Sequence, residues 1–221
     1  MGAGFNVSRF KSKLEEYGVI KTSKFLVRIP SPPRFRASYG QQSILLNKAS
    51  RDMEFWCEGA KMPGIGLNVH DIWRYGYGAM EKRPYAPIFT DILLTFIGDG
   101  KGIIWSFFQQ WIQLIANYSM ASNETVMSNS GIIINQRPYE LAYKEDYAVD
   151  ISIIVFDDMG TEIFNIVLRE AYPTLLEDIQ LSWNNNNEIM RIPVNLTFRD
   201  FHNETFPTVR SKERTLQEFA L

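Results

Sequence analysis

Cysteine is almost absent from this chain of 221 residues, because Cys57 is the only one. A single cysteine excludes an internal disulfide framework and a cysteine-based metal cluster. Histidine is equally scarce, since only His70 and His202 occur and neither has a nearby pattern of Asp, Glu or Cys. A metal ion needs several converging ligands. We therefore expect no metal site and no cofactor.

Long apolar runs and a large excess of one charge are also missing. No stretch reaches the roughly 18 apolar residues of a membrane-spanning helix, and the N-terminus lacks the apolar core of a signal peptide. The formal net charge of −2 argues against a general nucleic-acid binder, which usually has a basic excess. We expect a protein made in a cytoplasm, or assembled there, with no integral membrane association.

Catalytic signatures are weak throughout the chain. Three glycines at 98, 100 and 102 precede an expected helix, but they lack the GxxxxGK(S/T) spacing that binds phosphate. Asp157 and Asp158 are followed by Met159 and Gly160 between two alternating stretches, which is typical of a hairpin turn. No GxSxG, HExxH or Cys/His arrangement occurs. The sequence therefore predicts no catalytic residues, and we expect a protein that is not an enzyme.

The strongest pattern in the chain spans residues 88–117. Alternating apolar residues predict one long strand over 88–97, with both faces largely covered. From Ile103 the apolar period becomes helical and predicts an amphipathic helix over 103–117. A sheet with an apolar face needs a cover, and this helix is the obvious one. The expected core residues are Phe96, Phe107, Phe108, Trp111 and Ile115.

The remaining stretches are mostly typical of strands. The expected strands cover residues 24–29, 53–59, 69–77, 147–155, 164–168, 179–183 and 190–198. A short helix over 5–17 belongs to an N-terminal extension, 1–24, that precedes a β domain, 25–200. In the last strand Met190, Ile192, Val194, Leu196 and Phe198 are expected to face inward.

Four stretches lack a strand pattern. Residues 34–52 have no clear period, so we expect a long loop or insertion, which in a compact domain is usually functional. Residues 81–87 contain two prolines and are expected to be a connection. Residues 118–139 are loop-like. Residues 201–221 show no strand pattern and are expected to form a C-terminal arm.

Charge is distributed unevenly along the chain. Residues 9–36 contain eight Lys or Arg against two Glu, whereas residues 140–178 contain ten Asp or Glu against one Lys and one Arg. Such asymmetry fits contact between unlike ends of neighbouring subunits, although two solvated surfaces explain it equally well. The candidate interface residues are Arg34, Arg36, Ile44, Leu45, Leu46, Lys48, Arg51, Asp157, Asp158 and Glu162.

The order of these elements resembles the tail tube proteins of contractile-tailed bacteriophages, including relatives that initiate the tube at the baseplate. The resemblance covers roughly residues 25–198. It is carried by the stretches 24–29 (KFLVRI), 57–58, 62–64, 71–78, 89–117, 146–147, 151–160, 169–173, 179–182 and 192–198. Their order and spacing together carry the resemblance.

This resemblance implies a mainly β fold with one flanking helix, a β-sandwich or small barrel. Six copies would form a ring with a continuous inner barrel, and stacked rings would form the channel for genome delivery in the virion tail. The implied partners are further copies, the tail sheath protein, baseplate tube proteins and the tape-measure protein, with DNA passing transiently through the lumen. The residues expected to face that lumen are Arg191, Asn195, Thr197 and Arg199.

Other functions remain open at this point. A tube-initiating baseplate protein has the same kind of fold, and so does the tube protein of a type VI secretion system. A carbohydrate-binding β-sandwich is a different class, and it would use the aromatic residues at 73–77 as a stacking platform.

Overall fold

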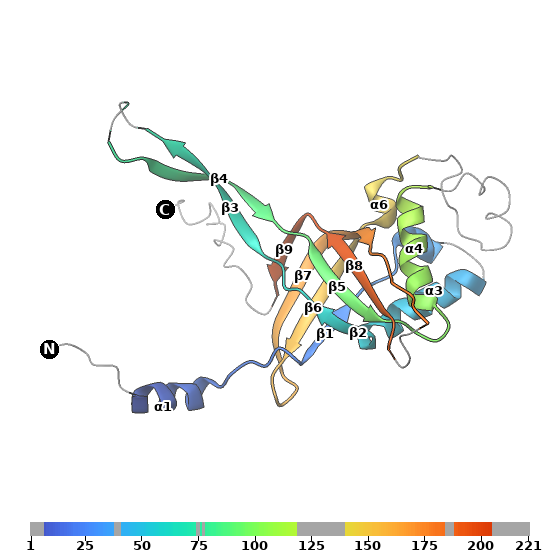
Figure 1. Cartoon of the computed structure of the whole chain (residues 1–221), viewed down its shortest axis with the longest axis horizontal. Helices are drawn as coiled ribbons and strands as arrows, with labels where there is room; N and C mark the ends of the chain where they lie inside the picture. Colours follow the sequence, from blue (N-terminus) through green and yellow to red (C-terminus); the bar gives the residue numbers. More distant parts are fainter. Residues whose placement is uncertain are drawn as a thin grey trace, which may run out of the picture.

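The computed structural model describes residues 7–37, 41–73, 76, 78–118, 140–183 and 188–204 (Figure 1). Within them a seven-stranded antiparallel sheet forms the body, helices lie against it, and a separate two-stranded hairpin projects away from it. The sheet order is β1 (Phe25–Arg28), β6 (Val149–Phe156), β7 (Glu162–Leu176), β8 (Arg191–Thr197), β5 (Ile92–Ile97) and β2 (Cys57–Ala60), with β9 (Asp200–Asn203) paired to β7.

The long strand β7 joins the two halves of this sheet. Its first part pairs with β6 and β9, and its last part pairs with β8. Between them lies Glu170, which has a positive φ of 52° and donates its backbone N–H to the Asp150 carboxylate at 2.9 Å. A left-handed residue bends a strand locally. Part of the gap between the strands expected over 164–168 and 179–183 is therefore a change of pairing partner within one continuous strand, which runs on to Leu176.

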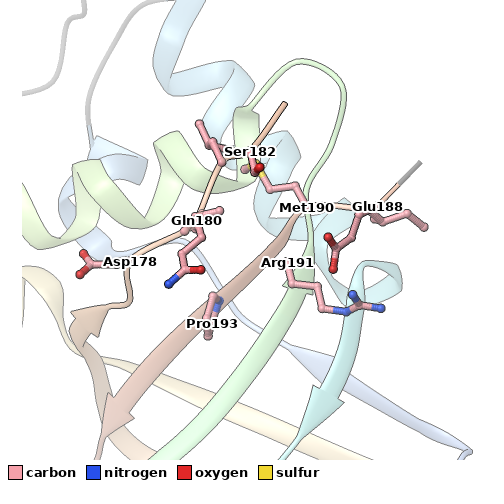
Figure 2. A pocket seen from close by; sticks show the side chains of 10 residues that line it. Asp178, Gln180, Ser182, Glu188, Met190, Arg191 and Pro193 are labelled. Atoms are coloured by element: carbon pink, nitrogen blue, oxygen red, sulfur yellow. The ribbon is translucent and has the colours of Figure 1, made fainter. Parts of the chain in front are cut away.

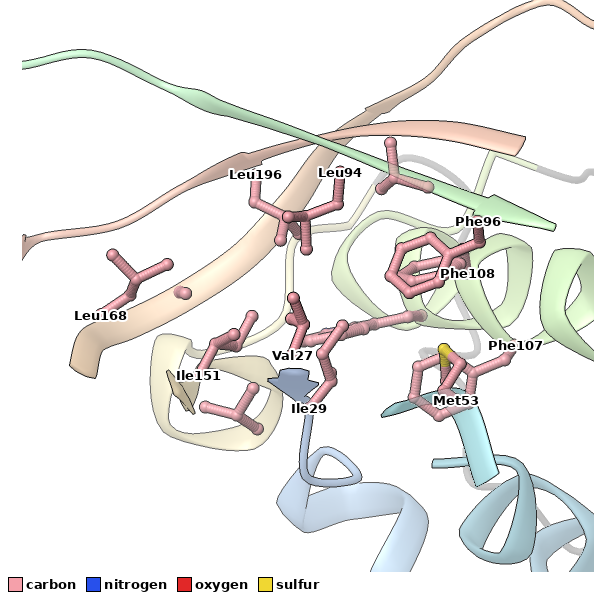
Figure 3. Close-up of a cluster of buried hydrophobic side chains, with 14 of the residues drawn as sticks. Val27, Ile29, Met53, Leu94, Phe96, Phe107, Phe108, Ile151, Leu168 and Leu196 are labelled. Carbon is pink, nitrogen blue, oxygen red and sulfur yellow. The ribbon is translucent and has the colours of Figure 1, made fainter. Parts of the chain in front are cut away.

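The sheet curls, because its two terminal strands β1 and β2 contact each other. Helix α4 (Ile103–Ile115) packs against the curled sheet (Figure 3). Phe96, Phe107, Phe108 and Trp111 are fully buried there, and Ile115 is partly buried against the same cluster. The Trp111 indole N–H donates to the Tyr147 carbonyl at 2.9 Å, which satisfies the one polar atom of that buried side chain.

The loop expected over residues 34–52 is wrong, because two helices occupy it. These are α2 (Pro33–Ala37) and α3 (Gln41–Asp52), followed by a 3-10 turn, η1 (Met53–Phe55). Among the described side chains of α3 and η1, the buried positions are Leu46, Ala49, Ser50 and Met53. They have helical spacing, but a small residue and a serine at the middle two positions hide the pattern. The Ser50 hydroxyl donates to the Ile29 carbonyl at 2.6 Å, which allows its burial.

The prediction of one strand over 88–97 is also wrong, because one strand ends at Phe89 and another begins at Ile92. β4 (Glu81–Phe89) pairs only with β3 (Ile65–Ile72) among the described strands, and β5 pairs with β2 and β8. β4 includes the stretch expected to be a connection. Its prolines, Pro84 and Pro87, are tolerated because each strand of a two-stranded ribbon has an open edge that needs no N–H donor.

Smaller corrections concern the ends of elements. Residues 179–183 form no strand, whereas residues 200–203, expected in the arm, form β9. The expected strand over 147–155 begins at Val149, because Tyr147 ends a short helix, α6 (Lys144–Tyr147). The N-terminal helix is present as α1 (Val7–Tyr17). Residues 119–139, 184–187 and 205–221 lie outside the described part. The first of these ranges contains most of the loop expected over 118–139, and the last contains most of the expected C-terminal arm.

Candidate assembly surfaces

The β3–β4 hairpin exposes one apolar face along its length. Ile65, Leu67 and Val69 alternate on this face and are 64%, 61% and 50% exposed. The other face of β3 carries Gly66, Asn68 and His70, because side chains alternate across a strand. An isolated hairpin is marginally stable until its apolar face packs against something. The hairpin thus has an apolar face that is at least half exposed at these three positions.

The base of the hairpin is fixed to the body. The Phe89 ring packs on Phe198 and Phe201, with ring centroids 5.9 and 5.8 Å apart. At the same point the backbone of Gly64 lies so close to Thr90 that a Cβ would be 2.9 Å from the Thr90 hydroxyl oxygen. This close approach requires glycine. The hairpin direction is therefore set by packing at its base.

A second apolar surface lies where β7 leads into β8 (Figure 2). Leu181 and Trp183 are 85% and 100% exposed. Two adjoining cavities of about 340 and 470 Å³ lie beside them, and the second is also lined by Trp105 from α4. We call this surface the β7–β8 groove and define it by its lining residues Trp105, Leu176, Glu177, Asp178, Ile179, Gln180, Leu181, Ser182, Glu188, Ile189, Met190, Arg191 and Pro193.

The face of β8 that points away from the core carries three of the four expected lumen residues. Arg191 donates two hydrogen bonds to the Glu58 carboxylate at 2.7 and 3.1 Å, and these hold the pKa of Glu58 below its usual range. The Asn195 amide donates to Glu177 at 3.0 Å, and the Thr197 hydroxyl donates to the Asp91 carboxylate. The three acidic groups named here are therefore all hydrogen-bonded on this face.

Arg199, the fourth expected lumen residue, lies beyond the end of β8 in a charged network. It pairs with Glu170 and with Asp200, the latter at 3.0 Å. Lys144 pairs with Glu170 at 2.5 Å, and Arg169 pairs with Asp200 at 2.6 Å. This network surrounds the bend of β7 and ties β9 and α6 to it. Its position suits a bracing role for the bent strand.

The expected interface residues do not gather on one surface. Leu46 is only 2% exposed and belongs to the core, so its assignment as an exposed apolar anchor is wrong. Arg34 pairs with Asp146 at 3.3 Å. Asp158 pairs with Lys21 at 2.8 Å and Lys24 at 2.9 Å. The exposed members are Arg36, Lys48, Arg51, Asp157, Asp158 and Glu162, and the side chains of Ile44 and Leu45 lie outside the described part.

Reactive groups are few in the part of the chain that the structure describes. No three His, Cys, Asp or Glu side chains there are grouped so as to hold a metal ion. Burial raises the pKa of the Cys57 thiol to about 12, so the reactive thiolate is scarce at neutral pH. No described helix has the length and apolar character needed to cross a bilayer.

Sequence reasoning missed both apolar surfaces. The alternation of Ile65, Leu67 and Val69 against glycine, asparagine and histidine is visible in the sequence, but the expected strand began only at residue 69. Leu181 and Trp183 were assigned to a strand of their own. Neither pattern distinguishes a buried row from an exposed one, because burial depends on what lies over the face.

Comparisons with solved structures agree with this architecture. A chain of the PVC sheath–tube complex of an extracellular contractile injection system, in its extended state, is similar over 87% of this chain and 96% of its own, with a TM-score of 0.52 and 16% identity. A chain of the anti-feeding prophage baseplate is similar over 84% and 95%, with a TM-score of 0.53 and 10% identity. At such identities the likeness concerns the fold.

A further similar chain comes from the tube-terminating cap of the anti-feeding prophage, with a TM-score of 0.50, 17% identity, and coverage of 84% of this chain and 91% of its own. No curated protein matches the sequence. The family described as phage tail tube protein matches residues 20–204. That range includes every strand of the body and the projecting hairpin. The chain therefore belongs to the phage tail tube protein family.

Proposed function

We propose that this protein is a non-catalytic structural subunit of a bacteriophage tail tube. Six copies form a ring, and stacked rings form the channel through which the genome is delivered. The observation that carries this proposal is the β3–β4 hairpin. It projects from the body and exposes a row of apolar side chains. Monomeric proteins rarely expose such a row, so the hairpin fits contact with another subunit.

The two apolar surfaces support repeated head-to-tail contact. The hairpin continues β5 at one end of the sheet, and the β7–β8 groove lies at the opposite end of the same strands (Figure 1). Contact between unlike surfaces of identical chains generates rings or open stacks. Each of these two surfaces would contact a different part of a neighbouring copy. Stacking of this kind takes the place of the role expected for residues 34–52, which pack as helices on the body.

The proposed lumen wall is the outer face of β8 and its neighbours. Arg191, Asn195 and Thr197 each hold an acidic group on this face. Only Glu58 is paired with a cation there, because Asn195 and Thr197 are neutral donors to Glu177 and Asp91. The wall is therefore net negative and repels DNA, which suits a channel through which DNA passes without binding. We include the sheath, baseplate tube proteins and tape-measure protein among the partners and place the protein in the virion tail.

A tube-initiating baseplate protein is the second candidate. Helix α1 ends at residue 17, before the family match begins at residue 20, and an added segment of this kind suits a subunit that joins the tube to something else. A repeated subunit stacks on both faces of its ring, whereas an initiator stacks on one face alone. The two candidates therefore differ in the length of what they build.

Negative-stain electron microscopy of the purified full-length protein tests the proposal. We expect tubes with a central channel at high protein concentration, together with sixfold rings. Rings that never stack would favour the baseplate initiator. A protein that sediments as a monomer at all concentrations, and also when baseplate is added, would contradict both candidates.

A further inference from the structure

Helix α1 has an exposed apolar stripe of defined spacing. Val7, Phe10 and Leu14 lie at positions i, i+3 and i+7 of the helix, and each is about half exposed. This spacing is the anchor pattern of amphipathic helices that bind in an apolar groove of a partner. In Figure 1 the helix stands away from the body. Its stripe is therefore available to another surface.

The helix is an addition to the shared body. The family match begins at residue 20, after the helix has ended. The buried core cluster of the described residues, with the side chains packed against it, begins at Phe25. The core of the body, as far as the structure describes it, thus does not include the apolar stripe of α1, and the exposed surface of these side chains points to a contact outside that core.

The β7–β8 groove offers a surface of matching chemistry. Its apolar lining includes Trp105, Leu181 and Met190, and its acidic residues are Glu177, Asp178 and Glu188. The one basic lining residue is Arg191, which is paired with Glu58. The first two turns of α1 carry the basic residues Arg9, Lys11 and Lys13. Opposite charges around an apolar contact fix its register and speed association.

The last turn of α1 has a different charge. It carries Glu15 and Glu16, and Glu16 pairs with Lys13 at 2.5 Å within the helix. The helix is therefore basic at its start and acidic at its end. This polarity favours one direction of the helix along an acidic groove, with the basic start of α1 nearest to the acidic residues.

The helix and the groove of one chain lie on opposite sides of the molecule. Lys21 and Lys24 anchor the segment after α1 to Asp158 at the β6–β7 turn. Only residues 18–20 separate the helix from this anchor, and three residues span at most about 11 Å. That short link holds α1 on the side of the body away from its own groove (Figure 1). The occupant of the groove must come from elsewhere.

We propose that α1 of one subunit binds in the β7–β8 groove of a second copy of this chain. Val7, Phe10 and Leu14 pack against the apolar lining, and the basic start of α1 faces Glu177, Asp178 and Glu188. The inference rests on the proposed function to the extent that copies must lie next to each other. The contact joins unlike surfaces, so it can repeat from copy to copy.

Photo-crosslinking of the full-length protein tests this directly. The photoreactive residue p-benzoylphenylalanine replaces Phe10, and isotope-labelled and unlabelled chains are mixed before irradiation. We expect crosslinked peptides that join position 10 of one chain to residue 105 or residues 176–190 of a differently labelled chain. Crosslinks within one chain, crosslinks to the hairpin, or no crosslinks would each overturn the proposal.

Substitutions sharpen the result. Leu14→Glu should lower the intermolecular yield about tenfold or more, because it puts a charge in place of one of the three apolar anchors. Ser12→Glu on the opposite side of α1 should leave the yield within about twofold. Glu188→Lys should lower the yield, and combining it with Lys11→Glu should restore much of it. Equal yields for Leu14→Glu and Ser12→Glu would show that the stripe is not the contact.

The outcome is separable from that of the proposed function. Tubes that form without crosslinks in the groove would overturn the role of α1 and leave the tube function standing. Groove crosslinks between copies that build neither rings nor tubes would support the contact and contradict the tube function.

Discussion

The β3–β4 hairpin and the β5–β8 pair of the body have the same alternating pattern in opposite environments. In β5, Ile92, Leu94 and Phe96 are fully buried, and β8 supplies similar residues opposite them. In β3, Ile65, Leu67 and Val69 are at least half exposed. The two pairs of strands differ in what lies over them. The aromatic residues of α4 pack on the body, and the hairpin extends beyond it (Figure 1).

Under the proposed function, this difference separates the apolar residues that fold the chain from those that would assemble it. Burial of apolar surface is favourable wherever it occurs. In the body the surface is buried during folding, so its loss reduces the free energy of unfolding. Under the proposed function, the apolar surface of the hairpin is buried only when another copy binds, so its loss should reduce association. The following predictions test that separation by comparing substitutions in the two regions.

The largest effect is expected in the core of the body. Trp111→Asp removes a fully buried ring and introduces a charge there, which should lower the free energy of unfolding by at least about 3–5 kcal/mol. Urea denaturation followed by circular dichroism measures this. Trp105→Asp on the same helix is the control, because Trp105 is partly exposed, and it should cost about 1 kcal/mol. Equal losses for the two variants would contradict burial of the α4 stripe.

A smaller loss is expected in α3, the segment that the sequence suggested was a loop. Leu46→Ala should lower the free energy of unfolding by about 2–5 kcal/mol, because it leaves a cavity in the core. Lys48→Ala, at an exposed position two residues later, should change it by about 0.5 kcal/mol or less. A tolerated Leu46→Ala in thermal and urea denaturation would restore the loop interpretation.

In the hairpin we expect little change in folding and a clear change in assembly. Leu67→Glu should alter the free energy of unfolding by about 0.5 kcal/mol or less. It should raise the protein concentration needed for assembly about tenfold or more, since a charge would enter an apolar contact. His70→Glu adds the same side chain on the opposite face and is the matched control. Light scattering measured against protein concentration distinguishes the two variants. Identical curves for Leu67→Glu and His70→Glu would mean that the apolar face of the hairpin takes no part in assembly.

The smallest effect concerns the anchor of the N-terminal segment. The ammonium groups of Lys21 and Lys24 hold the pKa of Asp158 below its usual range. The stabilisation of the folded state by these two ion pairs is therefore fully present above the pKa of an unfolded aspartate, about 3.9. It is lost as the pH falls through the lower pKa that Asp158 has in the folded protein.

Asp158→Asn should accordingly speed backbone hydrogen exchange at residues 18–24 at neutral pH and leave the exchange of the core unchanged. High salt should have a similar effect on the wild-type protein, because exposed ion pairs are screened. Asp157→Asn at the neighbouring position is the control. Unchanged exchange in Asp158→Asn would show that the two ion pairs do not hold the segment.

The sequence by itself determined helix α4 and several strands of the body. The helical stripe of Phe107, Phe108 and Trp111 and the alternation in β6, in residues 164–168 of β7 and in β8 each keep one period. When the apolar residues keep one spacing over a whole helix or strand, only one face of that element is apolar, and this face must be buried. The Asp157–Gly160 turn was also visible, because its residue types suit the turn that the strands require; the Gly160 N–H donates to the Asp157 carbonyl at 3.0 Å. The order of these elements was enough to suggest the family.

Only the tertiary structure decided where the remaining apolar residues lie. Leu46 belongs to a helix whose buried side includes Ala49 and Ser50, and that side is recognisable only once Ile29 and α4 are in place. The strands β4 and β5 follow each other with almost no break in pattern, yet one leaves the body and the other enters it, because β5 has partners on both edges. Exposure of Leu67 and burial of Leu94 follow from these long-range contacts, which local sequence does not encode.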